Sequence, residues 1–284
     1  MKVLVFGKTG QVARALIAVG PAQGVQIIAL GRDDADLSDP KACAAAIAAS
    51  DADAVINAAA WTAVDAAESQ EDAAYAVNAA APAAMAEACA ARGLPFVHLS
   101  TDYVFDGSEG DPWLPDAPTH PLSAYGRTKR AGEQLIAQAG GAFVILRTAW
   151  VFDGEGQNFV TTMLRLSETR NALSVVADQT GGPTPAAAIA DACLAVAKAM
   201  TTGQAASGIY HLSGAPDVTW ADFARAIFAT AGRDVMVTDI TTADYPTPAR
   251  RPANSRLDCT SLSDTFGITR PDWRIYLTQM LHQI

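Results

Sequence analysis

Two side chains four positions apart could carry out acid–base chemistry together. Tyr125 and Lys129 lie in the segment SAYGRTK (123–129), which we expect to be helical. Residues at positions i and i+4 share one face of a helix, so both side chains would point into the same cleft. A phenol titrates near ~10, and a neighbouring ammonium stabilises the phenolate and lowers that pKa. The pair therefore predicts a proton donor for a carbonyl oxygen, as the reduction of a ketone requires.

A third side chain, Thr101, adds a hydroxyl group to this pair. Thr101 follows the predicted strand 96–99, in the segment LSTDYVFDG (99–107). Tyr125 and Lys129 open a helix after the long loop behind this strand, at the edge of a doubly wound sheet where ligands bind. There the Thr101 hydroxyl would bond the same substrate oxygen that Tyr125 protonates. The alternatives are an exposed tyrosine–lysine pair and a structural threonine at a strand end.

A glycine loop near the N-terminus predicts a dinucleotide site. Gly7 and Gly10, with Ala13 three positions later, follow the first predicted strand and open the first predicted helix. Glycine permits a tight turn and a close backbone approach, and the small Ala13 lets the helix pack against the strand. A cofactor pyrophosphate would bind at the N-terminus of that helix. The alternative is an ordinary strand-to-helix turn.

The residues after the second predicted strand bear on the type of nucleotide. The acidic residue that would hold the ribose hydroxyls is missing, and Leu30-Gly31-Arg32 stands in its place. Arg32 could pair with a 2′-phosphate, which favours NADPH. The acidic run DDAD (33–36) follows at once and could serve a ribose, so NADH stays an alternative. The small residues of NAAAWT (57–62) close the third predicted strand and leave room for a flat cofactor or for a tightly packed core edge.

The elements that must position these residues follow an alternating pattern. Apolar strands that alternate with helices form βαβ units around a parallel sheet. Ser38-Asp39-Pro40 has the form of a helix start and Arg92-Gly93 that of a helix stop. We therefore expect an α/β fold with a doubly wound parallel sheet of the Rossmann-like type. The predicted strands are 3–6, 25–30, 54–57, 96–99 and 143–147, and the predicted helices are 11–19, 40–49, 71–92 and 125–138.

After residue 150 the pattern changes, and turn-rich segments separate shorter elements. One helix is marked by the capping segment TWAD (219–222) and is flanked by predicted strands at 209–212 and 235–239. We expect residues 1–150 to form a dinucleotide-binding domain. Residues 151–284 would form mainly a smaller substrate-binding lobe, whose segments return to the first domain and interleave with it.

The composition narrows the class of protein. Of 284 residues, 50% are hydrophobic and 18% charged, and the formal net charge is −10. This supports a sizeable core and disfavours a nucleic-acid surface, and no apolar run reaches the ~18 residues of a membrane span. The four scattered cysteines, without metal-ligand spacing, are typical of buried thiols in a reducing compartment. We expect a cytoplasmic protein that binds neither nucleic acid nor membrane and has no metal site.

Together these features resemble the extended short-chain dehydrogenase/reductase family. The glycine loop, Thr101 and the Tyr125/Lys129 pair carry the resemblance. Within the family the likeness is strongest to the enzymes that reduce dTDP-linked 4-keto-deoxysugars, and it runs nearly from end to end. The matching segments are GKTGQV (7–12), NAAAWTAVDAAE (57–68), STDYVFDG (100–107), YGRTK (125–129), RTAWVF (147–152), QNFVTTMLRL (157–166), DQTGGPT (178–184) and RPANSRL (251–257).

The resemblance implies reduction of the C4 ketone of dTDP-4-dehydro-L-rhamnose to dTDP-L-rhamnose, with NADPH or NADH as the hydride source. It implies that Thr101, Tyr125 and Lys129 form the catalytic group, and that the latter two also contact the cofactor. The other expected cofactor-binding residues are Gly7, Gly10, Gln11, Val12, Arg32, Asp36, Leu37, Ala60, Trp61 and Thr62. The expected substrate-binding residues are Thr101, Asp102, Trp150, Asn158, Arg250, Arg251 and Asn254.

A nucleotide-sugar diphosphate requires local positive charge in an acidic protein. Arg250-Arg251-Pro252, with Arg256, is the densest basic cluster in the C-terminal half, and it lies in an irregular segment that can close on a ligand. The alternative is a solvated basic loop.

Some positions depart from the family pattern. Certain relatives hold magnesium at a dimer interface through an acidic residue of the first helix, but this chain has Ala15 there and alanines at 186–188. This departure argues against Mg²⁺ and against that particular dimer, and it leaves a monomer and a homodimer as alternatives. Trp61 stands where relatives can carry histidine, which would alter the pocket floor.

Three other functions fit parts of the pattern. A nucleotide-sugar 4,6-dehydratase would carry Thr-Asp-Glu, where this chain has Thr101-Asp102-Tyr103 and so lacks the general base. A non-catalytic NADP(H)-binding regulatory subunit, similar to that of methionine adenosyltransferase, could keep the fold, although the intact catalytic group favours an enzyme. A reductase of another 4-keto-deoxysugar nucleotide would share these motifs, because selection between epimeric sugars depends on a few hydrogen bonds.

Overall fold

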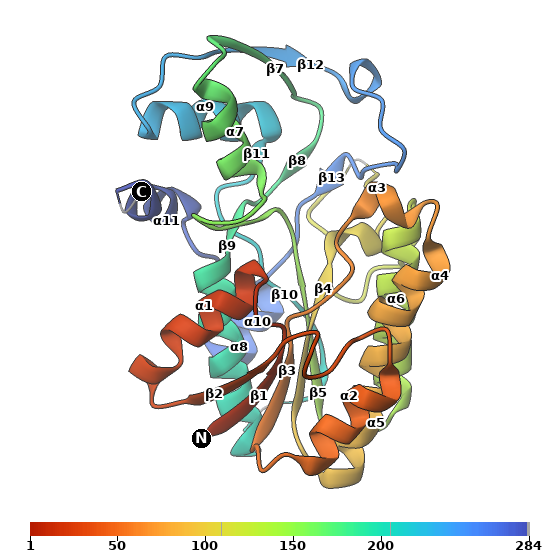
Figure 1. The fold of residues 1–284 in the computed structure, drawn as a ribbon. Helices are drawn as coiled ribbons and strands as arrows, with labels where there is room; N and C mark the ends of the chain where they lie inside the picture. The colour runs from red at the N-terminus through yellow and green to blue at the C-terminus, as the bar shows by residue number, and fades with distance from the viewer. Residues whose placement is uncertain (109, 205, 283–284) are drawn as a thin grey trace.

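A central parallel sheet organises the chain, which a computed structural model describes over residues 1–108, 110–204 and 206–282. The sheet has six strands in the order β10-β5-β4-β3-β1-β2, and every neighbouring pair is parallel (Figure 1). The strand order reverses beside β1, as in a doubly wound sheet, so the carboxyl ends of the strands meet at one edge. The strands are β1 (Lys2–Phe6), β2 (Gln26–Leu30), β3 (Ala54–Asn57), β4 (Phe96–Thr101), β5 (Phe143–Thr148) and β10 (Gly208–His211).

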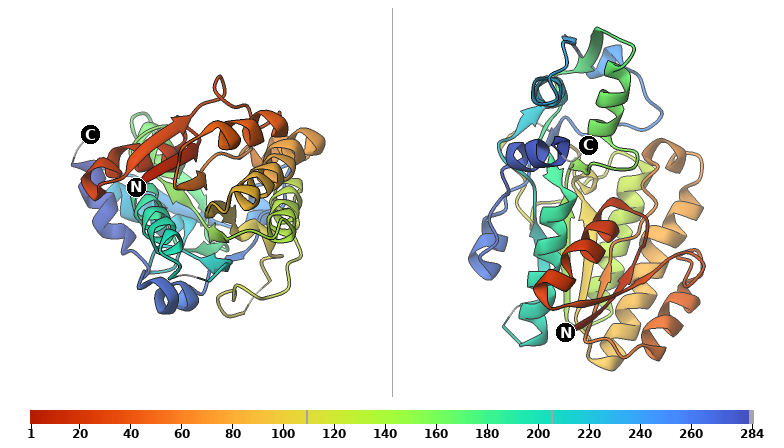
Figure 2. Two further views of the ribbon diagram at one scale, coloured as in Figure 1. Left: turned by 90° about the horizontal axis from the view of Figure 1, so that it is seen from below. Right: turned by 60° about the vertical axis from the view of Figure 1, so that its left-hand side comes forward.

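Helices cover both faces of this sheet (Figures 1 and 2). On one face α1 (Gln11–Val19) and α8 (Ala186–Thr201) share a buried cluster with the sheet residues Val3, Ile56 and Val144. On the other face a second cluster joins the sheet to three helices. These helices are α2 (Pro40–Ala49), α5 (Ala81–Arg92) and α6 (Ala124–Gln138). Both faces of the strands are therefore buried, which explains why they read as continuous apolar runs.

Capping residues set the ends of the helices as the sequence predicts. The Asp39 side chain accepts hydrogen bonds from the backbone N–H groups of Lys41 and Ala42, and Pro40 occupies the first turn of α2. Gly93 ends α5 with a left-handed φ of 65°. A side-chain cap of this kind stabilises a helix by about 1 kcal/mol, and glycine adopts the left-handed conformation without a Cβ penalty.

The helix predicted over 71–92 is interrupted. It consists of α4 (Glu71–Tyr75), a π-helical turn η2 (Ala76–Ala80) and α5. The extra residue of the turn places the Asn78 side chain against Trp61, whose N–H donates to Oδ1 at 2.9 Å, and against the Thr128 hydroxyl at 3.1 Å. A long alanine-rich run contains no local signal for this turn, which depends on contacts with α6.

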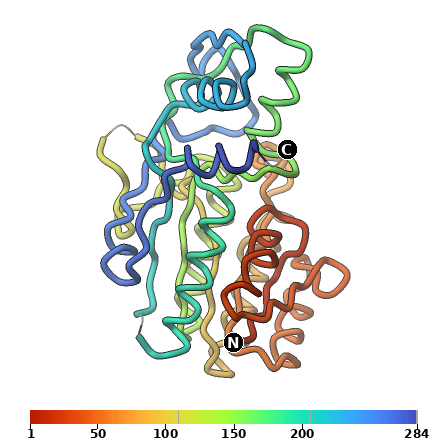
Figure 3. Tube along the Cα trace, turned by 90° about the vertical axis from the view of Figure 1, so that its left-hand side faces the viewer, coloured from red at the N-terminus to blue at the C-terminus, as the bar shows by residue number. Residues whose placement is uncertain are grey.

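The C-terminal lobe lies beyond the carboxyl edge of the sheet (Figure 1). It contains α7 (Phe159–Ser167), α9 (Trp220–Thr230) and a two-stranded parallel pair formed by β7 (Ala172–Val176) and β12 (Met236–Ile240). An aromatic cluster that includes Phe223 and Trp273 forms its core. Trp273 belongs to α11 (Trp273–Leu281), which lies between this lobe and the sheet layer (Figure 3).

Short strands tie the lobe to the sheet layer. The predicted fold class is confirmed: the main sheet is parallel and doubly wound, and the second half of the chain returns to it. It supplies the strand β10 at one edge, and α8 and α10 (Thr260–Phe266) pack on the core of the sheet. The division of labour between residues 1–150 and 151–284 stays a prediction. The remaining elements are η1 (Pro21–Gln23), α3 (Val64–Ala67), η3 (Asp102–Val104), β6 (Val151–Phe152), β8 (Thr180–Gly181), β9 (Thr184–Pro185), β11 (Val218–Thr219), η4 (Thr242–Asp244) and β13 (Asn254–Ser255). None of the described helices combines the length and apolar character needed to cross a membrane.

Candidate active site

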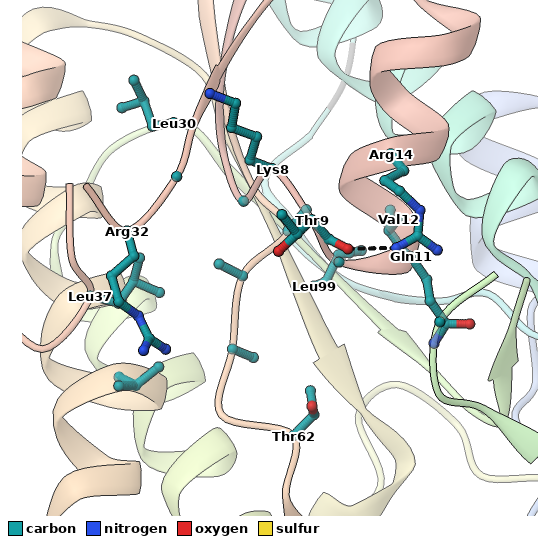
Figure 4. A pocket seen from close by; sticks show the side chains of 18 of the residues that line it. Lys8, Thr9, Gln11, Val12, Arg14, Leu30, Arg32, Leu37, Thr62 and Leu99 are labelled. Carbon is teal, nitrogen blue, oxygen red and sulfur yellow. Dashed lines mark hydrogen bonds between the residues drawn. The ribbon is translucent and has the colours of Figure 1, made fainter. Parts of the chain in front are cut away.

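A cleft of about 830 Å³ runs along the carboxyl edge of the sheet. Figure 4 shows its two ends: Gln11 and Arg14 of α1 lie at one end, and Arg32 lies at the other. The glycine loop after β1 separates them. Its size is within the ~300–1,000 Å³ range of small-molecule sites, and its position is where dinucleotides bind in doubly wound folds.

The glycine loop shapes the middle of this cleft. Gly7 has a φ of +116°, and a Cβ there would lie 3.3 Å from the Ala13 side chain and from the Ala58 backbone. Gly10 precedes α1 without a side chain to cap it, so the first N–H groups of the helix face the cleft. The Gln11 Oε1 atom is buried, and none of the described residues forms a hydrogen bond with it. A pyrophosphate fits here, because the helix N-terminus offers N–H donors and a favourable dipole.

The far end of the cleft carries basic side chains. The Arg32 guanidinium is 87% exposed and its Nε lies 4.0 Å from Asp36. Lys8 lies along Gly31, 3.4 Å from where a Cβ would be. Hydrogen bonds from Ser38 hold the pKa of Asp36 below its ordinary value. This end therefore offers two cations, Lys8 and Arg32, for a 2′-phosphate, together with the carboxylates of Asp33, Asp34 and Asp36, which suit ribose hydroxyls.

The cleft brings together nearly all the residues predicted to bind the cofactor. Trp61 is the exception: its backbone N–H donates to Asn78 and its indole Nε1 donates to Ala63 O at 3.1 Å, and its ring packs against the small buried cluster of Ala67, Ala74 and Ala124. The residues that line the cleft as predicted are Gly7, Gly10, Gln11, Val12, Arg32, Asp36, Leu37, Ala60, Thr62, Tyr125 and Lys129.

The catalytic group predicted from the sequence converges at the end of β4. Thr101 is the last residue of that strand and is buried. Ser123 caps α6 by accepting a hydrogen bond from the Gly126 N–H at 3.2 Å, which fixes the first turn that carries Tyr125. A side chain at Gly126 would collide with the backbone carbonyl of Tyr103, so glycine permits the close approach of α6 to η3.

The ionisation of Tyr125 differs from the sequence prediction. Burial raises the pKa of its phenol, and contact with the Thr101 hydroxyl opposes this rise only in part. The ammonium of Lys129 was expected to lower it, but Nζ is directed to other partners. In this structure Tyr125 is therefore a neutral phenol, which is the form that donates a proton.

Lys129 is the most confined of the three side chains. It is 2% exposed, and its Nζ lies 2.6 Å from Leu99 O and 3.1 Å from Nε2 of His98. Burial lowers its pKa to about 8, and the nearby Glu133 carboxylate works in the opposite direction. A lysine with this pKa exchanges its proton close to neutral pH.

A buried ion pair holds the helix that carries Tyr125 and Lys129 in place. Arg147 donates Nε to Oε1 and Nη2 to Oε2 of Glu133, both at 2.8 Å, and the two side chains are 2% and 0% exposed. The Ser100 hydroxyl donates to the same carboxylate at 2.6 Å. This bidentate geometry links α6 to β4 and β5, and it fixes the helix that carries the catalytic side chains.

Asp102 follows Thr101 and has an incompletely paired carboxylate. Its Oδ1 accepts a hydrogen bond from the Thr101 hydroxyl at 3.0 Å, while Oδ2 is buried and has no hydrogen-bond partner among the residues that the structure describes. Burial raises its pKa to about 6, with the neighbouring Ser255 and Thr101 hydroxyls acting in the opposite direction. An orphaned carboxylate oxygen beside the catalytic hydroxyl is suited to a sugar hydroxyl group.

The other residues predicted to bind substrate have different surroundings. Trp150 has a left-handed φ of 51° and stacks on Trp220 at a centroid distance of 3.5 Å. Arg250 is exposed, whereas Arg251 is paired with Asp65 of α3, its Nη2 lying 2.9 Å from Oδ2.

The two asparagines that were predicted to bind substrate form hydrogen bonds within the protein. Asn158 caps α7 through its Oδ1, and its Nδ2 donates to Asp153 O at 2.8 Å. Asn254 donates to the carbonyls of Ser108 and Asp111, both at 3.2 Å, and its Oδ1 accepts from Arg256. Both side chains therefore hold loops in place, and their contact with substrate stays a prediction.

Several residues of the site carry no role in the sequence prediction. Lys8 is one of them, although a lysine inside the glycine loop could have indicated a contact with the cofactor. Arg14 lines the cleft, donates to Thr9 O at 2.6 Å and pairs with Asp153 at 2.9 Å, a contact between distant segments that no local pattern reveals (Figure 4). The same holds for Val77, Thr148 and Gln157, which also line the cleft. Across the described parts of the chain, no three histidine, cysteine or carboxylate side chains cluster as a metal site would require.

A doubly wound parallel sheet, a glycine loop at a helix N-terminus and a Thr/Tyr/Lys group beside the same cleft define an extended short-chain dehydrogenase/reductase. The family model described as "RmlD substrate binding domain" matches residues 1–284. A dTDP-4-dehydrorhamnose reductase of Sinorhizobium fredii is 47% identical over 279 residues, covering 96% of this chain and 94% of the relative. One of Escherichia coli is 38% identical and covers 100% and 98%. The chain belongs to the dTDP-4-dehydrorhamnose reductase family.

Solved structures agree with this placement. The dTDP-4-dehydrorhamnose reductase of Clostridium acetobutylicum superposes with a TM-score of 0.93 at 36% identity, covering 100% of this chain and 99% of the other. That of Bacillus anthracis, crystallised with NADP, has a TM-score of 0.92 at 30% identity with the same coverage. A UDP-glucose 4-epimerase with a TM-score of 0.83 is only 15% identical and shows the shared fold alone.

Proposed function

We propose that this protein reduces the C4 ketone of dTDP-4-dehydro-L-rhamnose to dTDP-L-rhamnose, using NADPH. The observation that carries the proposal is that Tyr125 and Lys129 line a dinucleotide-sized cleft, with the Thr101 hydroxyl at the end of β4 in contact with Tyr125. The family membership supplies the substrate: the relatives that match over nearly their whole length are named for this ketone.

NADPH is favoured over NADH by the far end of the cleft. Lys8 and Arg32 both lie beside Gly31, where the adenosine ribose would be, and each could bond a 2′-phosphate. The NADP complex of the Bacillus anthracis relative supports the same choice. Asp36 could bond an unmodified ribose, so we expect NADH to be used less well.

In the proposed reaction Tyr125 transfers its phenolic proton to the sugar oxygen. The Thr101 hydroxyl, which donates to Asp102 in this structure, turns to donate its one proton to the same oxygen. Bound NADPH supplies the hydride that the C4 carbon receives. Lys129 returns a proton to the phenolate and orients the nicotinamide ribose. Because Tyr125 starts as a neutral phenol in a half-buried position, the proton moves only as negative charge develops on the oxygen.

The diphosphate and the sugar would bind between the cleft and the C-terminal lobe. Arg251 and Arg250 would neutralise the diphosphate, and Trp150 would pack against the sugar or base. Asp102 has a free buried oxygen for a sugar hydroxyl. Asn158 and Asn254 would contribute through the loops that they hold.

Mixing the protein with NADPH and dTDP-4-dehydro-L-rhamnose tests this function. We expect loss of NADPH absorbance in step with formation of dTDP-L-rhamnose, identified by NMR. Other 4-keto-deoxysugar nucleotides are the comparison, since faster turnover of one of them would replace the substrate assignment. Tight binding of NADPH without turnover of any 4-keto sugar would support the non-catalytic regulatory subunit instead.

Two further properties belong with this proposal. The four cysteines are free and buried, which supports a reducing cytoplasmic setting. We expect a monomer or homodimer that turns over without added Mg²⁺, because Ala15 replaces the acidic residue that some relatives use.

A further inference from the structure

A continuous row of hydrogen bonds runs beneath Lys129. The Ala59 N–H donates to Oδ1 of Asn57 at 3.1 Å, and Nδ2 of Asn57 lies 3.1 Å from Nδ1 of His98. Nε2 of His98 lies 3.1 Å from Nζ of Lys129, which in turn donates to Leu99 O at 2.6 Å. Asn57 and His98 are fully buried, so water does not compete for these bonds.

The amide of Asn57 sets the direction of this row. Its oxygen must face the Ala59 N–H, because the reverse orientation would bring two donors together. The NH₂ group therefore faces His98 and donates to Nδ1. A neutral imidazole that accepts at Nδ1 carries its proton on Nε2. Burial supports this neutral form, since it lowers the pKa of His98 well below its ordinary value.

The Nε2–H group then points at Nζ of Lys129. An ammonium has three donors and no acceptor, so it cannot receive this hydrogen bond. An uncharged amine can: it accepts from His98 with its lone pair and donates to Leu99 O. Each group in the row thus donates to the next, and the row is complete only when Lys129 is an amine.

We infer that Asn57 and His98 are positioning residues that stabilise the uncharged amine of Lys129 and so set the pH at which this side chain exchanges its proton. The inference rests on the proposed reduction, in which Lys129 returns a proton to Tyr125. The balance is simple: Tyr125 loses a proton to the sugar oxygen, the Lys129 ammonium gives one to the phenolate, and solvent restores the ammonium. The amine left after the second transfer is the form that the row holds.

The charged groups around Lys129 do not account for an amine. Glu133, one turn further along α6, favours the ammonium, but Arg147 of β5 pairs with that carboxylate and offsets it. Asp102, at the end of β4, acts on Tyr125 and would also favour a cation nearby. The π-turn η2, which packs against α6, contributes the uncharged Asn78, whose Nδ2 donates to the Thr128 hydroxyl next to Lys129. The imidazole is therefore the contact that distinguishes the two states of Lys129.

The tautomer of His98 can be observed directly. We expect ¹⁵N-histidine NMR of the full-length protein at pH 7 to show His98 as a neutral ring with the proton on Nε2. The chain has only four histidines, and His98→Gln assigns the signal by its loss. A proton on Nδ1, or a charged ring at pH 7, would overturn the inference without any need for an active variant.

Asn57→Asp should reverse the row. The new carboxylate keeps the bond from Ala59 and accepts a proton on Nδ1, which leaves a lone pair on Nε2 facing an ammonium. We expect the His98 signal to switch tautomer. The alkaline limb of the kcat/KM profile, where activity falls as the Lys129 ammonium loses its proton, should move up by about 1–3 pH units because the ammonium is now favoured. An unmoved limb in a folded variant with a switched tautomer contradicts the inference, because a purely structural role changes stability or rate and not this limb.

A double variant separates the imidazole from the added charge. If Asn57→Asp acts through His98, its effect on the alkaline limb should shrink strongly in a His98→Gln background. An equal shift in both backgrounds would mean that the carboxylate acts on Lys129 through space. The NMR result does not depend on turnover: an Nε2–H ring in a protein that reduces no 4-keto sugar would refute the proposed function and leave this row intact.

Discussion

Two ion pairs illustrate the difference between two regions of the site. We call α6 and the buried residues beneath it the floor, and the partly exposed contacts between α3 and the loop 245–252 the rim. Glu133 and Arg147 lie under the catalytic helix with side chains 0% and 2% exposed, held by two parallel bonds. Asp65 and Arg251 join α3 to the C-terminal loop (245–252), and their side chains are 42% and 27% exposed. The buried pair fixes a geometry that does not need to change, whereas the partly exposed pair can open for a ligand at little cost.

The largest effect should come from the floor. Tyr125→Phe removes the proton donor and should lower kcat by about 10²- to 10⁴-fold, with NADPH binding retained. Tyr103→Phe is the matched control, because Tyr103 packs edge-on against Tyr125 with ring centroids 5.4 Å apart and loses the same atom. Steady-state kinetics and NADPH titration measure both. Near-normal turnover of Tyr125→Phe would mean that Tyr125 is not the proton donor and that the reaction does not depend on the floor.

The buried pair itself should be next. Glu133→Gln leaves the Arg147 guanidinium buried without a countercharge and should lower the free energy of unfolding by about 3–5 kcal/mol. Urea unfolding measures this, and Glu71→Gln is the control, because Glu71 pairs with Arg127 at a surface where the side chains are 42% and 45% exposed. That variant should lose no more than about 1 kcal/mol. Equal losses would mean that burial does not distinguish the two pairs.

The contrast between floor and rim also describes what the sequence could reveal. Helical spacing placed Tyr125 and Lys129 on one face, and the glycine loop located the cleft, because both signals depend on residues close together in the chain. The caps of α2 and α5 are local in the same way. These parts of the fold were predictable.

Contacts between distant segments were not predictable. The partners of Lys129 come from β4 and those of Arg251 from α3, and nothing near either residue in the sequence indicates them. The same reason explains why the pKa of Tyr125 was predicted in the wrong direction: spacing gives a neighbour, but burial decides the ionisation. The π-turn at 76–80 and the alanine-rich α8 also depend on packing across the sheet.

At the rim, Arg251→Ala should act on substrate binding. Loss of a charge-assisted hydrogen bond to the diphosphate is worth about 1.5–3 kcal/mol, so the KM for the nucleotide sugar should rise about 10- to 150-fold. The KM for NADPH serves as the internal control and should stay the same, because Arg251 does not line the cofactor cleft. The reverse pattern, with NADPH affected and the sugar unaffected, would place Arg251 at the cofactor.

The smallest effect should follow from Asp65→Asn, which removes the negative charge that pairs with Arg251. In the wild-type protein Oδ1 of Asp65 also accepts a hydrogen bond from the Ala249 N–H at 3.1 Å, and the amide oxygen of the variant can keep this bond. We expect a loss of no more than about 1 kcal/mol in unfolding free energy, since both side chains are partly exposed. The hydrogen bond from Arg251 holds the pKa of Asp65 below its ordinary value of 3.8. The wild-type pair therefore contributes to stability above that pH, and its contribution fades as the pH falls through the lowered value.

In the same Asp65→Asn variant the KM for the sugar nucleotide should stay level or fall, because Arg251 no longer has to leave a carboxylate to meet a diphosphate. A rise in that KM comparable to the one in Arg251→Ala would show instead that Asp65 orients the guanidinium for the ligand, and the rim would then be as pre-built as the floor.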